Sequence, residues 1–241
     1  MLTLATLVLC SCASTDDIDT STPEGLFKLG ATYEKDERYE EALADFNDLR
    51  NKHPYSKYAL QAELHIADIN YKRENYVEAE NSYKLFKEFH PKNKMSDFVT
   101  FRIAMSIFKQ LPDSIDRDLS LAKDAILYFE QVYTNYPNSD YAGSARDHKD
   151  KSLLKLARKE AYIGDFYFIR DKYDSALSRY ADVLVKYPHL GLEPRMLYGA
   201  ASSAAKLNEK DKAQNFYDRL LAEFPKSKWT RKAKSALETK L

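Results

Sequence analysis

The chain has little of what β-sheet proteins, disulfide-rich proteins and nucleic-acid binders depend on. Among its 241 residues are 6 glycines and 8 prolines, too few for the tight turns of a β-sheet protein or for a collagen-like chain. Its 37 basic residues are balanced by 37 acidic ones, which argues against a nucleic-acid binder because such proteins need a basic surface. The 44% of hydrophobic residues can bury a sizeable core, and the composition favours an all-α protein.

Cysteine is confined to Cys10 and Cys12, so no disulfide or cysteine-based zinc site can stabilise the rest of the chain. The five histidines show no metal-ligand spacing, and we expect no metal and no cofactor. The motifs GxxxxGK[ST], GxGxxG and GxSxG are also missing. We therefore expect that the protein is not an enzyme.

The N-terminus is typical of an exported, lipid-anchored protein. Residues 2–9 form an apolar run that is too short to span a bilayer and resembles the core of a secretory signal peptide. Leu9 and Ser11 precede Cys12 with the spacing of a bacterial lipobox. The alternative is an apolar N-terminus with incidental cysteines. We predict a lipoprotein signal peptide over 1–11, lipidation at Cys12, and a flexible polar tether over 12–22.

A fivefold internal repeat organises the rest of the chain. In each copy an alanine is followed by an aromatic residue four positions later, by an apolar residue three further on, and by a proline after five more. This spacing predicts a helix with one apolar face, ended by proline. The alanine and proline positions are Ala42 and Pro54, Ala79 and Pro91, Ala125 and Pro137, Ala176 and Pro188, and Ala213 and Pro225.

A second helical pattern precedes each alanine. In the first copy it reads Leu26, Leu29, Gly30 and Tyr33, which is half of the tetratricopeptide signature. A small residue such as Gly30 is expected where two helices approach closely. The sequence therefore predicts an all-α fold, an α-solenoid of five tetratricopeptide helix pairs with a C-terminal capping helix that begins near Trp229.

The intervals between the prolines suggest a division of the folded chain. The longest interval separates the third and fourth copies, where residues 144–168 form a long helical run. We predict an N-terminal part, 23–143, with repeats one to three, and a C-terminal part, 144–241, with this linking helix, repeats four and five and the capping helix. The serines that follow three of the prolines are expected to cap the next helix: Ser56, Ser139 and Ser227.

Several features of the chain together resemble one family. They are the lipobox, the short tether, the five repeats, and the stretch from Asp116 to Pro188 with its segments YPNSDYA and KYP. This is the BamD family of lipoproteins in the bacterial outer-membrane barrel-assembly machinery. The resemblance implies a non-enzymatic scaffold, anchored in the outer membrane and facing the periplasm. It implies as partners unfolded outer-membrane barrel proteins, the POTRA region of BamA and possible further assembly lipoproteins, but no nucleic acid. Ala13, directly after the lipobox cysteine, fits outer-membrane rather than inner-membrane sorting.

The same resemblance points to one partner-binding residue. In the family, an arginine in the second helix of repeat four is associated with the contact to BamA, and Arg179 occupies the matching position here. The alternative is a solvated arginine that pairs with Asp182 on the same helix.

Positions on the first helix of each pair that are not needed for packing within the repeat predict a groove for an extended peptide. The alternative is an ordinary surface without a ligand. The predicted groove residues are Phe27, His65, Ile69, Lys72 and Arg102.

Two stretches are locally basic despite the balanced total. Residues 146–159 contain six basic and two acidic residues, and residues 226–240 contain six basic and one acidic. Such runs are usually solvated helix faces, and as a hypothesis they dock a partner.

An alternative function for the whole chain is that of a periplasmic tetratricopeptide lipoprotein for cell-wall coordination or for pilus or secretin assembly.

Overall fold

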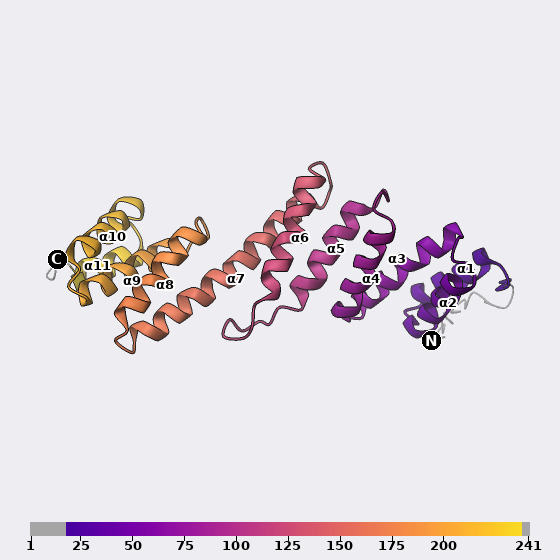
Figure 1. Cartoon of the computed structure of the whole chain (residues 1–241), viewed down its shortest axis with the longest axis horizontal. Helices are drawn as coiled ribbons and strands as arrows, with labels where there is room; N and C mark the ends of the chain where they lie inside the picture. Colours follow the sequence, from indigo (N-terminus) through magenta and orange to yellow (C-terminus); the bar gives the residue numbers. More distant parts are fainter. Residues whose placement is uncertain (1–17, 238–241) are drawn as a thin grey trace, which may run out of the picture. The chain divides into compact units, whose positions relative to one another are not determined.

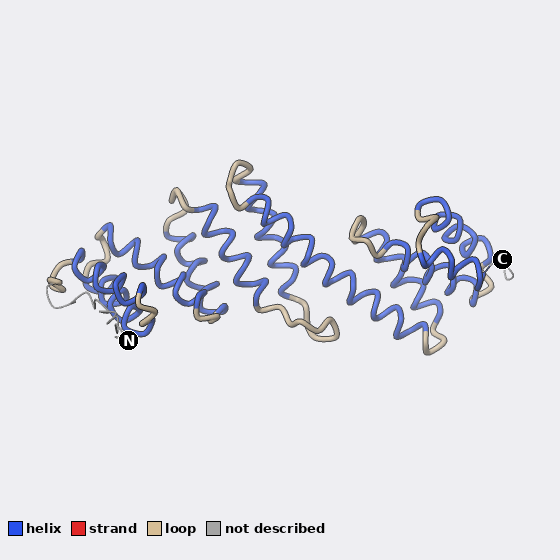
Figure 2. Tube along the Cα trace, turned by 180° about the vertical axis from the view of Figure 1, so that it is seen from behind, coloured by secondary structure: helices blue, strands red, loops and turns tan. Residues whose placement is uncertain are grey.

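The structure, a computed structural model, describes residues 18–237, and within this range it is built of eleven α-helices and no strand (Figure 1). Figure 2 shows the same segment as helices joined by loops alone. The predicted all-α fold of tetratricopeptide helix pairs is confirmed. The contacts divide the chain into two compact units, unit 1 up to Pro91 and unit 2 from Lys92. The predicted division between 143 and 144 falls inside unit 2 and stays a prediction.

Unit 1 contains the first two helix pairs, α1 (Pro23–Lys35) with α2 (Tyr39–Lys52) and α3 (Lys57–Lys72) with α4 (Tyr76–Phe89). Capping side chains fix where two of these helices begin, because an oxygen there accepts an otherwise unpaired backbone N–H. Thr22 accepts the N–H of Gly25 at 3.0 Å. Ser56 accepts the N–H of Ala59 at 3.0 Å, which confirms the predicted cap at this serine.

The core of unit 1 explains the glycine at position 30. Phe46 and Leu49 of α2 are fully buried, as the repeat pattern predicts. A Cβ atom at Gly30 would lie 2.9 Å from the Phe46 ring, closer than side-chain carbon atoms normally approach. Gly30 is therefore required for α1 to pack against α2, and its predicted role is confirmed.

Unit 2 continues with helices that pack on their neighbours in sequence, and the closing helix packs on α9 and α10. The predicted linking helix corresponds to the 27-residue α7, and the predicted capping helix corresponds to α11. The elements are α5 (Ser96–Lys109), α6 (Leu121–Asn135), α7 (Ala142–Phe168), α8 (Tyr173–Lys186), α9 (Glu193–Lys206), α10 (Lys210–Glu223) and α11 (Lys228–Leu237).

The cap predicted at Ser139 is wrong. The residue that precedes α7 is Tyr141, which makes no side-chain capping bond. Ser139 instead accepts the N–H of Tyr141 at 3.2 Å and donates its hydroxyl hydrogen to Asp97 of α5 at 2.7 Å. The serine thus joins the start of α7 to α5, a tertiary contact that the local pattern does not reveal. Ser227, the third of these serines, accepts the N–H of Trp229 at 3.2 Å.

A wedged tyrosine organises the middle of unit 2. The ring of Tyr180 on α8 is almost fully buried between two helical glycines, Gly164 of α7 and Gly199 of α9. Cβ atoms at these glycines would lie 2.7 and 2.8 Å from the Tyr180 ring carbons. The missing side chains therefore let three consecutive helices close around one aromatic residue.

Four of the tight turns between the helices of a pair contain a non-glycine residue in the left-handed conformation, with φ between 58° and 62°. Each of these residues stands five positions before the alanine of its repeat, and they are Glu37, Glu74, Asp171 and Asn208. The third pair differs, because Ser120 at this position has φ −55° and follows a longer loop.

None of the helices described between residues 18 and 237 has the length and apolar content needed to cross a membrane.

Candidate functional site

The predicted groove of unit 1 centres on a buried carboxylate that joins two repeats. Glu34 of α1 has a side chain only 10% exposed. Its two oxygens lie 2.5 Å from Nδ1 of His65 and 2.7 Å from Nζ of Lys72, both on α3. Burial alone would raise the pKa of Glu34, but the hydrogen bonds from His65 and Lys72 outweigh this effect and lower the pKa. The carboxylate is thus held in its charged form between α1 and α3.

Aromatic rings border this polar cluster. The ring of His65 stacks on that of Phe46 with centroids 5.1 Å apart. Phe27 lies 5.3 Å from His65 and 5.6 Å from Tyr58. The structure therefore brings three of the predicted groove residues, Phe27, His65 and Lys72, together on α1 and α3. We name this surface the A-helix face of unit 1.

The prediction for Ile69 as a groove-lining residue is wrong. Ile69 is fully buried and belongs to the hydrophobic cluster that contains Leu26 and Phe46. The pattern within one repeat does not mark Ile69 as a packing position, but α3 buries it where this helix packs on the preceding pair.

Arg102, the fifth predicted groove residue, belongs to unit 2. Its guanidinium carbon lies 5.1 Å from the ring centre of Phe98 on the same helix, α5. Whether Arg102 contributes to a groove stays a prediction.

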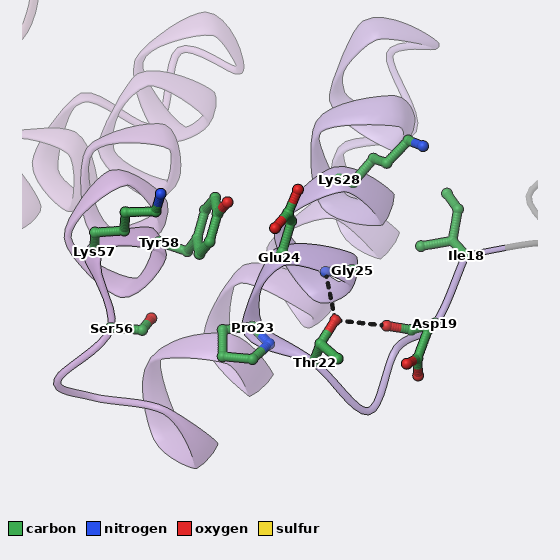
Figure 3. Close-up of a pocket in the computed structure, with 10 residues that line it drawn as sticks. All are labelled: Ile18, Asp19, Thr22, Pro23, Glu24, Gly25, Lys28, Ser56, Lys57 and Tyr58. Atoms are coloured by element: carbon green, nitrogen blue, oxygen red, sulfur yellow. Dashed lines mark hydrogen bonds between the residues drawn. The ribbon is translucent and has the colours of Figure 1, made fainter.

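A hollow of about 500 Å³ lies where the chain enters α1 (Figure 3). On one side Thr22 donates its hydroxyl hydrogen to the backbone oxygen of Asp19 at 3.0 Å. On the other side Lys57 and Tyr58 begin α3, with the lysine nitrogen 4.9 Å from the ring centre of Tyr58. Tyr58 also contacts Phe27, so this hollow adjoins the A-helix face of unit 1.

Arg179, the predicted partner-binding residue, pairs with a different acid from the one expected. Its guanidinium donates to Glu160 of α7 at 2.6 Å, whereas Asp182 pairs with Lys186. The hydrogen bond that Arg179 donates to Glu160 raises the pKa of Arg179. Its side chain remains 39% exposed.

The basic stretch 146–159 is partly used within the chain. Lys149 pairs with Glu130 of α6 at 3.0 Å. Lys155 and Lys159 each donate to a backbone oxygen of the loop between α5 and α6, that of Pro112 and that of Arg117, at 2.6 Å. These lysines attach α6 and the loop to α7. The pair with Glu130 neutralises the charge of Lys149, whereas the bonds to backbone oxygens leave Lys155 and Lys159 charged.

The predicted lipidation site and its surroundings cannot be compared with the structure. Cys12 and the predicted signal peptide, 1–11, lie outside the described residues, as does most of the tether, 12–22. Among residues 18–237, no group of three or more His, Cys, Asp or Glu side chains could hold a metal ion.

A polar bridge between a buried tyrosine, Tyr180, and two half-buried charged residues in unit 2 has no counterpart among the predicted site residues. Asp165 of α7 accepts the hydroxyl hydrogen of Tyr180 at 2.8 Å and forms an ion pair with Arg195 of α9. Burial, followed by the bond to Asp165, raises the pKa of Tyr180, which keeps its hydroxyl protonated. Tyr83 and Asp68 form the same bond in unit 1, also 15 residues apart. This recurring interval is the sequence feature that could have revealed the bridge.

Comparison with known proteins places the chain. The family model YfiO, described as an outer membrane lipoprotein, matches residues 19–218, from the turn before α1 into α10. The chain belongs to this family. Two curated relatives bear the name outer membrane protein assembly factor BamD. The protein from Rickettsia prowazekii is 29% identical over 92% of this chain and 89% of its own length. The protein from Caulobacter vibrioides is 25% identical over 86% of this chain and 67% of its own.

Because the chain belongs to the YfiO family and is similar to these relatives, it is an outer-membrane-associated protein assembly factor. Among solved structures, the TPR2AB domain of yeast Sti1 in its pHSP90 complex matches with a TM-score of 0.46 and 17% sequence identity, over 91% of this chain and 85% of that one.

Proposed function

We propose that the protein is a lipid-anchored scaffold of the outer-membrane β-barrel assembly machinery. In this role it binds unfolded barrel proteins and docks on the POTRA region of BamA, which promotes barrel folding and insertion without enzymatic chemistry. The observation that carries the proposal is the match to one outer-membrane lipoprotein family along nearly the whole helical array, from residue 19 to residue 218. Curated relatives with the assembly-factor name support it.

We assign the binding of barrel segments to the A-helix face of unit 1. Phe27 and Tyr58 offer aromatic surface, and Lys72 and His65 offer hydrogen-bond donors beside them. An extended, partly apolar segment needs this combination, because its side chains seek rings and its unpaired carbonyl oxygens seek donors. Glu34 holds both His65 and Lys72 in place, so the surface is preorganised for such a segment.

Docking on BamA is assigned to Arg179. The ion pair with Glu160 fixes the guanidinium across α7 and α8 while leaving part of it exposed. An arginine held in this way loses little side-chain entropy when a partner carboxylate binds its free edge.

Membrane attachment is assigned to Cys12, which becomes the first residue after removal of the signal peptide, 1–11. The segment 12–22 then spans the distance between the acyl chains and Pro23 of α1 as a tether. The helical repeats in this arrangement lie in the periplasm, where other assembly lipoproteins join them.

Affinity purification from membranes tests the docking. We expect the tagged protein to copurify BamA, and we expect Arg179→Glu to reduce the yield of BamA at least fivefold. Absence of BamA beside some other stable partner would refute the proposed function.

Control variants separate docking from folding. Glu160→Gln removes the internal ion pair but keeps the arginine, so it should retain most of the BamA. The exchange of both residues, Glu160→Arg with Arg179→Glu, restores an ion pair within the chain but reverses the charge shown to a partner. If that double variant recovered full copurification, Arg179 would have only a structural role.

A further inference from the structure

Unit 2 contains a second pocket that none of the predicted sites includes. It has a volume of about 200 Å³ and lies among α7, α8, α9 and α11. Its walls are largely aromatic, with Phe168 from α7, Tyr180 from α8, Tyr198 from α9 and Trp229 from α11. Tyr198 and Trp229 pack against each other with ring centroids 5.5 Å apart. Arg179 does not line this pocket, so the pocket is separate from the proposed docking residue.

The size of the pocket limits its occupant. Pockets for cofactors and drug-sized ligands usually hold about 300–1,000 Å³. A pocket of about 200 Å³ is more suited to one large side chain that a longer segment inserts. Aromatic walls favour an aromatic side chain there, because ring pairs gain free energy beyond that of area burial.

The charges around the pocket indicate which charge a bound segment should carry next to its aromatic side chain. The acid in its wall, Asp165, is neutralised by Arg195. Lys232 at the rim contacts rings instead, with its nitrogen 4.9 Å from the ring centre of Tyr198 and 5.4 Å from that of Trp229. Its positive charge is thus held over the pocket and remains exposed to solvent.

The helix that supplies Lys232 is strongly basic. The described α11 carries Lys228, Arg231, Lys232 and Lys234 and no acidic residue. In addition, the hydroxyl oxygen of Ser202 in the pocket wall is buried and has no hydrogen-bond partner among the described residues. A buried polar atom left without a partner is costly and is often found at sites that receive one from a ligand. The described part of α11 therefore presents positive charge alone beside the pocket.

We propose that this pocket binds one aromatic side chain from an extended acidic segment of a partner protein, with a neighbouring carboxylate of that segment lying against Lys232. The aromatic side chain supplies the burial, and the complementary charge selects the segment. This proposal goes beyond the proposed function, because it concerns neither the A-helix face of unit 1 nor Arg179.

The chain provides its own reporter for the test, because Trp229 is its single tryptophan and lines the pocket. The full chain is titrated with the peptide acetyl-Gly-Glu-Phe-Glu-Gly-amide while tryptophan emission is recorded. We expect a saturable change. A peptide with alanine in place of phenylalanine, or with lysines in place of both glutamates, should bind at least about tenfold more weakly.

A matched pair of variants tests the role of the rim. Lys232→Glu and Lys234→Glu change the net charge equally on the same helix, but only Lys232 lines the pocket. Lys232→Glu should weaken binding of the acidic peptide about tenfold, whereas Lys234→Glu should change it less than threefold. Far-UV circular dichroism confirms that both variants fold, and the comparison among peptides on the unmodified chain needs no variant.

The proposal would be overturned by any of three results: equal binding of the phenylalanine and alanine peptides, equal effects of the two variants, or no saturable change at millimolar peptide. A change of tryptophan emission with protein concentration alone would show that a second copy of the chain fills the pocket, and this too would overturn it. None of these results bears on copurification of BamA, so the two proposals fail independently.

Discussion

The two glycines of α7 should respond in opposite directions to the same substitution. Alanine is favoured over glycine in a helix interior by about 1 kcal/mol. At Gly143 an added Cβ meets no atom within 4 Å, so Gly143→Ala should gain about 0.5–1 kcal/mol, near the lower value because the position is close to the helix start. At Gly164 the Cβ would lie 2.7 Å from the ring of Tyr180, which must move by several tenths of an ångström.

The ring of Tyr180 has little room for that movement. Its opposite edge faces Gly199, where the helix backbone of α9 is equally close, and its hydroxyl is bonded to Asp165. Overpacking in such a core costs roughly 1–3 kcal/mol. We take the upper half of that range and subtract the gain in helix propensity. Gly164→Ala should then destabilise unit 2 by about 1–2 kcal/mol. The two alanine variants should therefore differ by about 2 kcal/mol.

Urea unfolding measures this difference, followed by the fluorescence of Trp229, which reports unit 2 alone. A double variant checks the cause. With Tyr180→Leu in the background, the ring that obstructs the new methyl group is gone, and Gly164→Ala should lose its destabilising effect. If Gly164→Ala were stabilising in the unmodified chain, or if its cost persisted with leucine at 180, the close approach would not be the reason for the glycine.

The remaining predictions concern the A-helix face of unit 1 and the anchor. Because the pKa of Glu34 is lowered by folding, its stabilising contribution is present above the unfolded value near 4.5 and is lost as the pH falls through the folded value. The stability advantage of the unmodified chain over Glu34→Gln, measured by urea unfolding, should therefore be constant near neutral pH and shrink below pH 4.5; a constant advantage down to pH 3 would contradict the hydrogen-bonded carboxylate. Cys12→Ser should release the protein from the membrane fraction, as an immunoblot would show, while the control Cys10→Ser should leave it bound; retention of both variants would refute the predicted anchor.

Local spacing was enough to predict most of the helices. The alanine, the aromatic residue and the proline of each repeat locate the second helix of every pair, because one apolar face and a helix terminator are short-range properties. The buried Phe46 and Leu49 and the close contact at Gly30 are cases in which this reasoning is confirmed. The long helical run 144–168 likewise lies within α7.

Contacts between repeats were beyond that reasoning. Ile69 is buried in a cluster with residues of the preceding pair, so a pattern of one repeat misplaces it. Arg179 pairs with Glu160, 19 residues earlier, rather than with an acid on its own helix. Ser139 donates its hydroxyl hydrogen to Asp97 of α5, and the residue that precedes α7 is Tyr141. In each case the deciding neighbour comes from another helix, and its position depends on how the helices stack.

The left-handed residues of the turns have a consequence for where the chain can change in length. A turn closed by one residue such as Glu37 or Asp171 has a fixed number of residues, and an insertion there would displace both helices of the pair. The third pair has no such residue, and α7 donates hydrogen bonds to its longer loop at Pro112 and Arg117. Between these two attachments the exposed residues 113 and 114 can accept additional sequence without moving α5 or α6. A fluorescent or affinity tag inserted there would mark the protein inside its assembly while leaving both chain ends as they are.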